Sequence, residues 1–170
     1  MVELVRGRVE VLSVPSMLHQ FIARSLFLLM NEFVERHGLG LVMSAPTRVK
    51  IDDRHYREPD VLFVANRNRR RQQEQYWEAI DLAAEIISPD DPDRDLVDKR
   101  RDYEKAEISE YWIIDPRNDS IQVNTLRNGV YEPFMSSRNA IASSIVLNGF
   151  ELDVEQLFRD ARSAMHGQTP

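Results

Sequence analysis

Hydrophobic residues recur at every third or fourth position between Met17 and His37, the spacing of one face of an α-helix. Ser16 precedes this run and predicts the N-cap, because its hydroxyl can accept a hydrogen bond from the first turn. Gly38 follows the run and predicts the end of the helix. The hydrophobic positions are Leu18, Ile22, Leu26, Leu29, Phe33 and Val34.

Alternating or continuous hydrophobic runs predict β-strands in the rest of the first half of the chain. The polar segment 52–59 lies between two of these runs and predicts an antiparallel hairpin with a long loop. The last run ends before an acidic loop, residues 90–95. The runs are residues 3–13, 43–51, 60–65 and 80–88.

The second half of the chain begins with a predicted helix at residues 96–106, followed by a dense hydrophobic strand at 111–114. Short runs joined by turns predict edge strands before a last helix at 154–164. These runs are residues 120–125, 129–134 and 144–147, with one turn at Arg127-Asn128-Gly129. The order predicts an α+β or mixed α/β fold in a single domain, with helices flanking one central mixed β-sheet and extra C-terminal strands.

Composition limits the sites and partners that the chain can have. The sequence has 170 residues, 42% hydrophobic, and no cysteine, so a thiol nucleophile and cysteine-ligated metals are excluded. The apolar runs are too short for a membrane span and no signal-peptide pattern is present, so we expect a cytoplasmic protein. The net charge of -6 requires a local basic patch or bound cations for nucleic-acid binding. Arg67 and Arg69 to Arg71 form one basic segment, which is either such a patch or a solvated helix start.

Two acidic residues stand at hydrophobic strands. Asp60 lies at the start of one run and Glu85 lies inside another. If the two strands are neighbours, the carboxylates can converge, and a divalent cation between them would offset their repulsion. The alternative is that Asp60 caps a turn and that Glu85 pairs with an arginine such as Arg48 or Arg57. The spacing does not separate these two interpretations.

Lys99 provides a third candidate. At about 100° per residue, Leu96, Lys99, Tyr103 and Ala106 share one face of the predicted helix, and Lys105 points nearly opposite. An ammonium on the inward face can neutralise the two carboxylates or stabilise charge on a phosphoryl group. The alternative is a lysine whose stem covers the sheet while its charged end reaches solvent.

Four short motifs follow one another with a specific spacing: Arg57-Glu58-Pro59-Asp60-Val61, Glu85-Ile86-Ile87-Ser88-Pro89, Arg94-Asp95-Leu96-Val97-Asp98-Lys99-Arg100-Arg101-Asp102-Tyr103 and Glu110-Tyr111-Trp112-Ile113-Ile114-Asp115-Pro116. In this order they resemble a bacterial restriction-endonuclease family of uncharacterised role, which belongs to the PD-(D/E)xK nuclease superfamily. The resemblance covers nearly the whole chain, from Gly7 and His19 to residues 149–152.

The resemblance implies a restriction-endonuclease-like fold and a Mg²⁺-dependent phosphodiesterase site, with Mn²⁺ as a further option. It implies that Asp60 and Glu85 are catalytic metal ligands and that the Ile86 backbone carbonyl completes the metal shell. The superfamily's lysine is expected two residues after the second acid, where this chain has Ile87. The family resembled here supplies it from the following helix, at Lys99.

Three residues are possible supports for this site. The family pattern also has a histidine where this chain has His19, which could reach the site or a phosphate, or make a local hydrogen bond. Arg57 is a plausible partner for either acid. The family commonly has glutamate after its early glycine, whereas Gly7 is followed here by Arg8, so Glu10 is the candidate replacement.

The leading hypothesis is therefore a metal-dependent deoxyribonuclease with DNA as its substrate. The alternative is a catalytically inactive nucleic-acid-binding or assembly protein on the same fold. We also expect a homodimer or higher homo-oligomer, in which the polar strands of residues 120–134 could pair between subunits.

Overall fold

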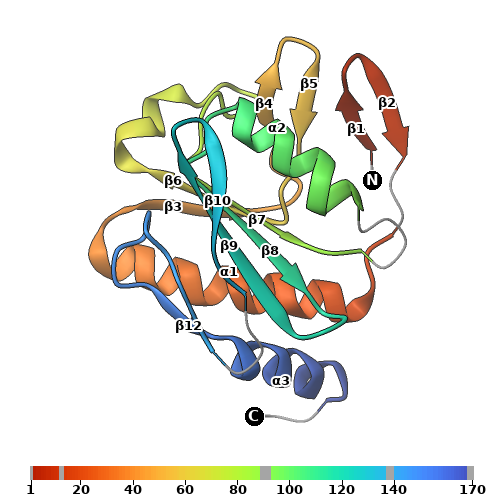
Figure 1. Ribbon diagram of the computed structural model, residues 1–170, viewed down its shortest axis with the longest axis vertical. Coiled ribbons are helices and arrows are strands. Elements are labelled where there is room, and N and C mark those ends of the chain that lie inside the picture. The colour runs from red at the N-terminus through yellow and green to blue at the C-terminus, as the bar shows by residue number, and fades with distance from the viewer. Residues whose placement is uncertain (1, 12–13, 89–92, 137–139, 168–170) are drawn as a thin grey trace.

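The computed structural model describes residues 2–11, 14–88, 93–136 and 140–167. An N-terminal hairpin precedes the long helix, and a C-terminal helix closes the order of elements (Figure 1). The strands are β1 (Val2–Val5), β2 (Arg8–Val11), β3 (Gly40–Ser44), β4 (Val49–Asp52), β5 (His55–Arg57), β6 (Val61–Ala65), β7 (Leu82–Ile86), β8 (Glu110–Asp115), β9 (Ser120–Arg127), β10 (Val130–Ser136), β11 (Ile141–Ser143) and β12 (Glu151–Asp153). The helices are α1 (Met17–His37), the 3₁₀ helix η1 (Asn66–Arg71), the π-helix η2 (Arg94–Lys99), α2 (Arg100–Lys105) and α3 (Val154–Met165).

Six strands form a mixed sheet in the order β10-β9-β8-β7-β6-β3. Strands β7 and β8 run parallel, and the other pairs in this sheet are antiparallel. Parallel neighbours need a crossover connection, which η2 and α2 supply between β7 and β8. The helix that carries Lys99 is therefore the connection that follows the strand of Glu85.

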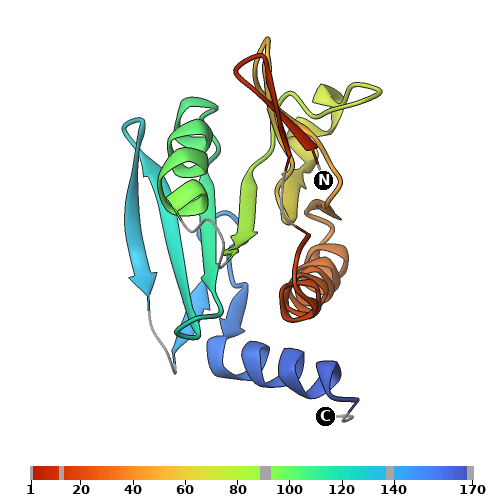
Figure 2. The ribbon, with the colours of Figure 1, turned by 90° about the vertical axis from the view of Figure 1, so that its right-hand side faces the viewer.

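Two hydrophobic clusters cover the two faces of the sheet. On one face, α1 and α3 pack on alternate residues of the central strands, including Val61 and Ala84. On the other face, the intervening residues Leu62 and Ala83 join Tyr103 of α2. Figure 2 shows α1 and α2 on opposite sides of the sheet. Strands β6 and β7 are buried along their whole length because both faces of the sheet are covered there. This explains their nearly continuous hydrophobic sequence.

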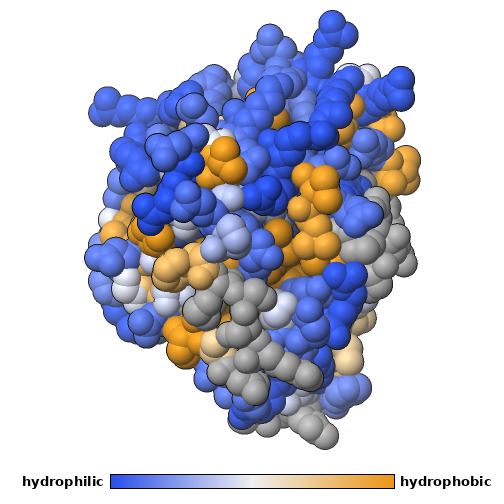
Figure 3. All heavy atoms as spheres, viewed as in Figure 1, coloured by the Kyte–Doolittle hydropathy of each residue, from blue (hydrophilic) through white to orange (hydrophobic). Residues whose placement is uncertain are grey.

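The face that carries α2 is mostly hydrophilic, with smaller hydrophobic areas between the polar groups (Figure 3). Within the described chain, no helix combines the length and the hydrophobicity that a membrane span requires.

The predicted long helix is confirmed at both ends. The Ser16 hydroxyl accepts a hydrogen bond from the His19 backbone N–H at 3.2 Å, and Gly38 ends the helix with a left-handed φ of 62°. The predicted helices at 96–106 and 154–164 correspond to η2 with α2 and to α3. The predicted turn at Asn128-Gly129 joins β9 and β10, with both residues at positive φ.

The single strand predicted at residues 3–13 is wrong. The structure has a hairpin of β1 and β2 there, turned by Arg6 and Gly7 at φ values of 50° and 78°. The alternation of valines continues across this turn, so the hydrophobic pattern alone did not reveal it. Part of the predicted strand, residues 12–13, lies outside the described residues.

The run predicted at residues 43–51 is two strands, and the loop predicted at 52–59 contains a third. β3 pairs with β6, as the predicted antiparallel hairpin required, but the hairpin of β4 and β5 is inserted between them. The strand predicted at 144–147 is also wrong, since β11 and β12 pair on either side of that segment. Of the predicted acidic loop, residues 90–92 lie outside the described part of the chain.

Substitution of two glycines at the α1–β3 connection, Gly38 and Gly40, tests how closely β3 packs beside β6. A Cβ added at Gly40 would lie 2.0 Å from the Val64 carbonyl oxygen, whereas one at Gly38 would meet no atom within 4 Å. Gly40→Ala is expected to lower the free energy of unfolding by about 3 kcal/mol, because the two backbones must separate. Gly38→Ala should cost only about 1 kcal/mol, for its left-handed φ. Urea unfolding measures both, and equal losses would contradict the register.

Candidate active site

Asp60 immediately precedes β6, at the point where the ladder with β7 ends. Its Oδ2 accepts a hydrogen bond from the Ile86 backbone N–H at 2.8 Å and lies 3.1 Å from His19 Nε2. The printed register pairs Val61 with Ala84, so its continuation places Pro59 opposite Ile86. The Asp60 side chain, in place of a backbone carbonyl of β6, is the acceptor for the Ile86 N–H. Proline has no N–H, so Pro59 offers no donor to the Ile86 carbonyl.

The Ile86 carbonyl faces the same edge. The N–H and C=O groups of one residue point to the same side of an extended strand, as in the doubly bonded pairs of an antiparallel ladder. The Ile86 N–H points to Asp60, so its carbonyl oxygen is directed to the side where Pro59 offers no donor. The Asp60 carboxylate and the Ile86 carbonyl therefore lie at the same edge of β7.

Glu85 lies on the opposite face of β7 from its two neighbours. Ala84 and Ile86 belong to the cluster beneath α1, whereas Ala83 and Ile87 belong to the cluster beneath α2. Glu85 alternates with the former pair and therefore points toward α2. Only 1% of its side chain is exposed.

Each oxygen of the Glu85 carboxylate accepts a hydrogen bond from the α2 side. Lys99 Nζ lies 2.7 Å from Oε2, and the Tyr103 hydroxyl donates to Oε1 at 2.6 Å. Both oxygens of the buried carboxylate therefore have a donor from this side of the sheet. Lys99 also lies 2.9 Å from Asp95 Oδ1, one helical turn earlier. The lysine is thus held between two carboxylates.

The helical spacing predicted Lys99 on the inward face and Lys105 on the outward face, and the structure confirms both positions. Lys99 and Tyr103 are buried against Glu85, whereas Lys105 is exposed and pairs with Asp52 at 2.7 Å. The alternative in which the Lys99 ammonium reaches solvent is therefore wrong, because only 9% of the Lys99 side chain is exposed and its ammonium contacts Glu85.

Burial is the largest influence on the ionisation of the two acids and the lysine. It raises the pKa of Glu85 to about 8, an effect that Lys99 opposes and Asp60 reinforces. Burial works against the charge of Lys99 too, but Glu85 and Asp95 raise its pKa overall. Burial also works against the charge of Asp60, yet the hydrogen bond from His19 lowers its pKa overall. The site therefore keeps one permanent positive charge among its carboxylates.

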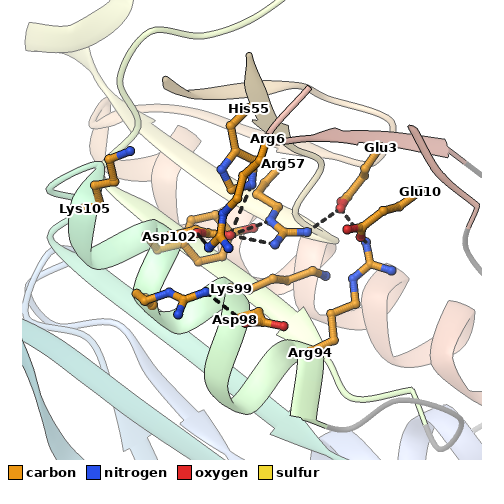
Figure 4. Close-up of polar contacts among 12 residues, drawn as sticks. Glu3, Arg6, Glu10, His55, Arg57, Arg94, Asp98, Lys99, Asp102 and Lys105 are labelled. Atoms are coloured by element: carbon orange, nitrogen blue, oxygen red, sulfur yellow. Dashed lines mark hydrogen bonds and ion pairs between the residues drawn. The ribbon is translucent and has the colours of Figure 1, made fainter. Parts of the chain in front are cut away.

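A second buried ionic group links the N-terminal hairpin, β5 and α2 (Figure 4). Arg57 is its centre, with Nη1 2.8 Å from Glu3 Oε2 and Nη2 2.6 Å from Asp102 Oδ2. His55 Nε2 lies 3.2 Å from the same Asp102 oxygen. We call Glu3, Arg57 and Asp102 the ionic crossbar.

The ionic crossbar holds the helix of Lys99 at two points. Asp102 belongs to α2, and Arg94 at the start of η2 lies 2.5 Å from Glu3 Oε2. Both attachments are several residues from Lys99, one on each side of it. They fix the rotation of the helix about its axis, which directs Lys99 and Tyr103 to Glu85.

Several predicted partners occupy other places. Arg57 contacts neither Asp60 nor Glu85, and Arg48 pairs with Glu58 at 2.9 Å, so the predicted pairing of Glu85 with either arginine is wrong. Glu10 is exposed and lies 3.8 Å from Arg94. The acid that the hairpin buries is Glu3.

The basic segment of residues 67–71 lies in η1, directly after β6. Asp60 precedes that strand, so the segment begins at the far end of β6 from Asp60. Arg67 forms an ion pair with the buried Asp81. This part of the segment is therefore a structural contact.

Three contributors to the site had weak signals in the sequence. Asp95 precedes Lys99 by four residues, a spacing that could have predicted their ion pair. Tyr103 was predicted on the same helical face as Lys99, and its hydroxyl adds a hydrogen bond that spacing does not show. Glu3 lies 54 positions from Arg57, and no local pattern indicates such a contact.

The donors present decide whether a divalent ion fits. Among the residues that the structure describes, no three His, Asp or Glu side chains form a group that could hold a metal ion. Mg²⁺ needs only one or two carboxylates, with other oxygens and water. An ionised carboxylate has about four lone-pair sites, so Glu85 retains capacity beside Lys99 and Tyr103. The oxygens of Asp60, Glu85 and Ile86 therefore fit a hard cation.

Two comparisons with known proteins found a match. A family model named Uma2 and described as "Putative restriction endonuclease" matches residues 1–155. The chain belongs to the Uma2 family. The predicted resemblance is thereby confirmed over most of the sequence, including every motif that carried it. A search of curated proteins returned no match.

A solved structure supports the predicted fold. The Uma2 chain resembles a crystal structure from Anabaena variabilis ATCC 29413 that is described as "a putative nuclease belonging to DUF820". The match has a TM-score of 0.77 and 19% identity, and it covers 94% of this chain and 90% of the other. The predicted restriction-endonuclease-like fold, with a mixed central sheet and flanking helices, is confirmed.

Removing the centre of the ionic crossbar should destabilise this Uma2 protein strongly. Arg57→Ala would remove the buried cation that Glu3 and Asp102 share, and we expect a loss of about 3 to 5 kcal/mol in the free energy of unfolding. Arg159→Ala is the control, because its pair with Glu155 is 57% exposed on both sides and should contribute about 0.5 kcal/mol. Urea unfolding compares the two, and similar losses would contradict the role of the crossbar.

The crossbar should also make stability depend on pH. Burial favours neutral Glu3, but Lys99 and Arg57 lower its pKa below the usual 4.5 overall. Its contribution is therefore complete above about pH 4.5 and is lost as the pH falls through the lowered pKa. Glu3→Gln should be less stable than the wild type at neutral pH, and the difference should shrink below about pH 4.5. Unfolding midpoints across this range provide the measurement, and a difference independent of pH would contradict the assignment.

Proposed function

We propose that this Uma2 protein is a divalent-metal-dependent endonuclease that hydrolyses DNA phosphodiester bonds, with Asp60, Glu85 and Lys99 as its catalytic residues. The observation that carries the proposal is their arrangement at the end of the β6–β7 ladder. Asp60 bonds to the Ile86 amide, and the neighbouring Glu85 bonds to Lys99 at 2.7 Å. Two carboxylates beside a lysine are the chemical groups of a PD-(D/E)xK site.

Asp60 and Glu85, with the Ile86 carbonyl, would hold Mg²⁺ or Mn²⁺, which supplies positive charge that polarises the scissile phosphate and acidifies water. His19 orients Asp60 by its contact with Oδ2. Tyr103 orients Glu85 by its hydrogen bond to Oε1. Lys99 places a fixed positive charge where negative charge develops on the phosphoryl group.

The position of the lysine is the departure from the superfamily pattern. Ile87 shares the face of Glu85 and packs in the apolar cluster beneath α2, so that position supplies no charge. Lys99 approaches the same carboxylate from the crossover helix. We infer that the helix provides the group that the strand lacks.

Cleavage of supercoiled plasmid and of single-stranded DNA tests this proposal. We expect cleavage with Mg²⁺ or Mn²⁺ and none with EDTA. Asp60→Ala, Glu85→Ala and Lys99→Ala should each reduce the rate by about 10²-fold or more, because each removes a charge at the reacting phosphate. Lys105→Ala is the matched control, since this exposed lysine of the same helix points away, and its rate should be unchanged.

Persistent cleavage in the Asp60→Ala and Glu85→Ala variants would refute the site. DNA binding without metal-dependent cleavage in the wild type would instead favour the binding-protein alternative.

A relocation of the lysine tests its role separately. Ile87→Lys combined with Lys99→Ala returns an ammonium to the face of Glu85 from the strand, and we expect it to recover part of the activity that Lys99→Ala loses. Val97→Lys combined with Lys99→Ala is the control. Position 97 is 57% exposed, so a lysine there restores the positive charge of the helix but not an ammonium beside Glu85. Equal activity of the two double variants would exclude a local role for the ammonium. Circular dichroism checks that each variant is folded.

A further inference from the structure

A pocket of about 520 Å³ opens beside Asp60, between α1 and the segment after β3. Asp60 and His19 line it, and both side chains are largely buried. The pocket therefore adjoins the proposed catalytic acid from the α1 side, whereas Glu85 and Lys99 approach from the α2 side.

The walls of the pocket combine apolar surfaces with a few polar groups. Pro15, Ala23, Phe27 and Pro46 supply the apolar part. Gln20, Arg24 and Ser44 supply polar groups. Concave sites of this size with few polar groups are typical of small-ligand pockets.

One stripe of α1 forms much of this lining. His19, Ala23 and Phe27 are spaced four residues apart, and Gln20 and Arg24 lie next to them. Residues at this spacing lie on one helical face, and eight residues of helix extend about 12 Å. The stripe thus extends away from Asp60 and ends at the ring of Phe27, with Arg24 next to it on the helix.

Arg24 differs from most other arginines of the described chain. The majority form ion pairs with a carboxylate, as Arg48 does with Glu58 and Arg162 does with Asp119. Arg24 forms no ion pair or side-chain hydrogen bond with a residue that the structure describes. His19 Nδ1 is likewise buried without a hydrogen-bond partner there. The pocket therefore holds one buried polar atom without a described partner, His19 Nδ1, and an exposed arginine, Arg24, that no described carboxylate engages.

We propose that this pocket binds one unpaired nucleotide of a DNA strand, next to the phosphate that lies at Asp60. The inference rests on the proposed nuclease function and specifies its substrate as single-stranded DNA or DNA with an extruded nucleotide. The base would stack on Phe27 and contact the prolines, and the Gln20 amide can donate and accept hydrogen bonds at a base edge. Arg24 would bind the neighbouring phosphate.

The shape of the pocket favours an unpaired nucleotide. Inside a duplex, both faces of a base are covered by its neighbours, so the base cannot enter a side pocket without leaving the stack. The distribution of charge agrees, because the acid that would hold a divalent ion and the cation Arg24 both border the apolar wall of the pocket. The two phosphates on either side of one nucleotide match these two charged groups.

Binding measured without catalysis tests the proposal. A fluorescent single strand of about 12 nucleotides and a duplex of the same sequence are titrated with the wild-type protein in EDTA, and anisotropy is followed. We expect the single strand to bind at least about tenfold more tightly, since only its bases can enter the pocket. Equal or tighter binding of the duplex, or no binding of either, would overturn the proposal.

Variants of the pocket identify the place of binding. Phe27→Leu keeps an apolar side chain but removes the stacking ring and should weaken single-strand binding by about fivefold or more, whereas Phe27→Tyr should retain it. Leu28→Ala is the control, because Leu28 is adjacent on α1, 47% exposed and outside the pocket lining. Arg24→Gln should reduce the slope of log affinity against log salt by about 0.7, as expected for the loss of one phosphate contact.

The outcomes separate this inference from the function on which it rests. If the Asp60, Glu85 and Lys99 variants abolish cleavage but Phe27→Leu and Arg24→Gln bind like the wild type, the catalytic site is supported and the pocket assignment is wrong. If single-strand binding depends on Phe27 and Arg24 but no metal supports cleavage, the pocket is supported and the nuclease proposal is wrong. Thermal unfolding of each variant excludes loss of the fold as the cause.

Discussion

Burying the Glu85 carboxylate costs free energy, and the contacts around the end of β7 offset that cost. A carboxylate with 1% of its side chain exposed has lost its water and needs donors on both oxygens. Lys99 and Tyr103 provide them from one helix, and Asp95 keeps Lys99 in place. If stability alone mattered, an apolar residue at this position would serve as well or better. Stability alone therefore does not explain the acid, whereas the catalytic role proposed for Glu85 does.

That helix is short and needs external attachment. Its first half is π-helical and its second half has the six residues of α2, too few to be stable alone. The ionic crossbar supplies the attachment by joining Asp102 to Arg57 and Glu3, so the N-terminal hairpin and β5 both contribute to the position of Lys99. Buried ion pairs add little net stability, but they specify geometry because each charge is costly without its partner. The crossbar thus specifies where the lysine lies.

Much of this arrangement follows from local patterns in the sequence, and the remainder depends on contacts between distant residues. The caps at Ser16 and Gly38 and the inward position of Lys99 are properties of single helices, so spacing predicted them. The β4–β5 hairpin was missed because β4 continues the hydrophobic run of β3 and because β5 buries polar residues, His55 and Arg57, that the pattern assigns to a loop. The place of Glu3 depends on a partner 54 positions away, and no periodicity encodes it. The catalytic roles of Asp60, Glu85 and Lys99 remain predictions.

The Ile86 amide gives the site a built-in spectroscopic reporter. Its N–H donates to the Asp60 side chain at 2.8 Å instead of to a backbone carbonyl of β6. A hydrogen bond to a charged acceptor is stronger than one to a neutral carbonyl. The ¹H and ¹⁵N resonances of this single amide therefore register whatever changes the charge density on Asp60. One cross-peak in a two-dimensional NMR spectrum would follow ion binding at the carboxylate without any label at the site.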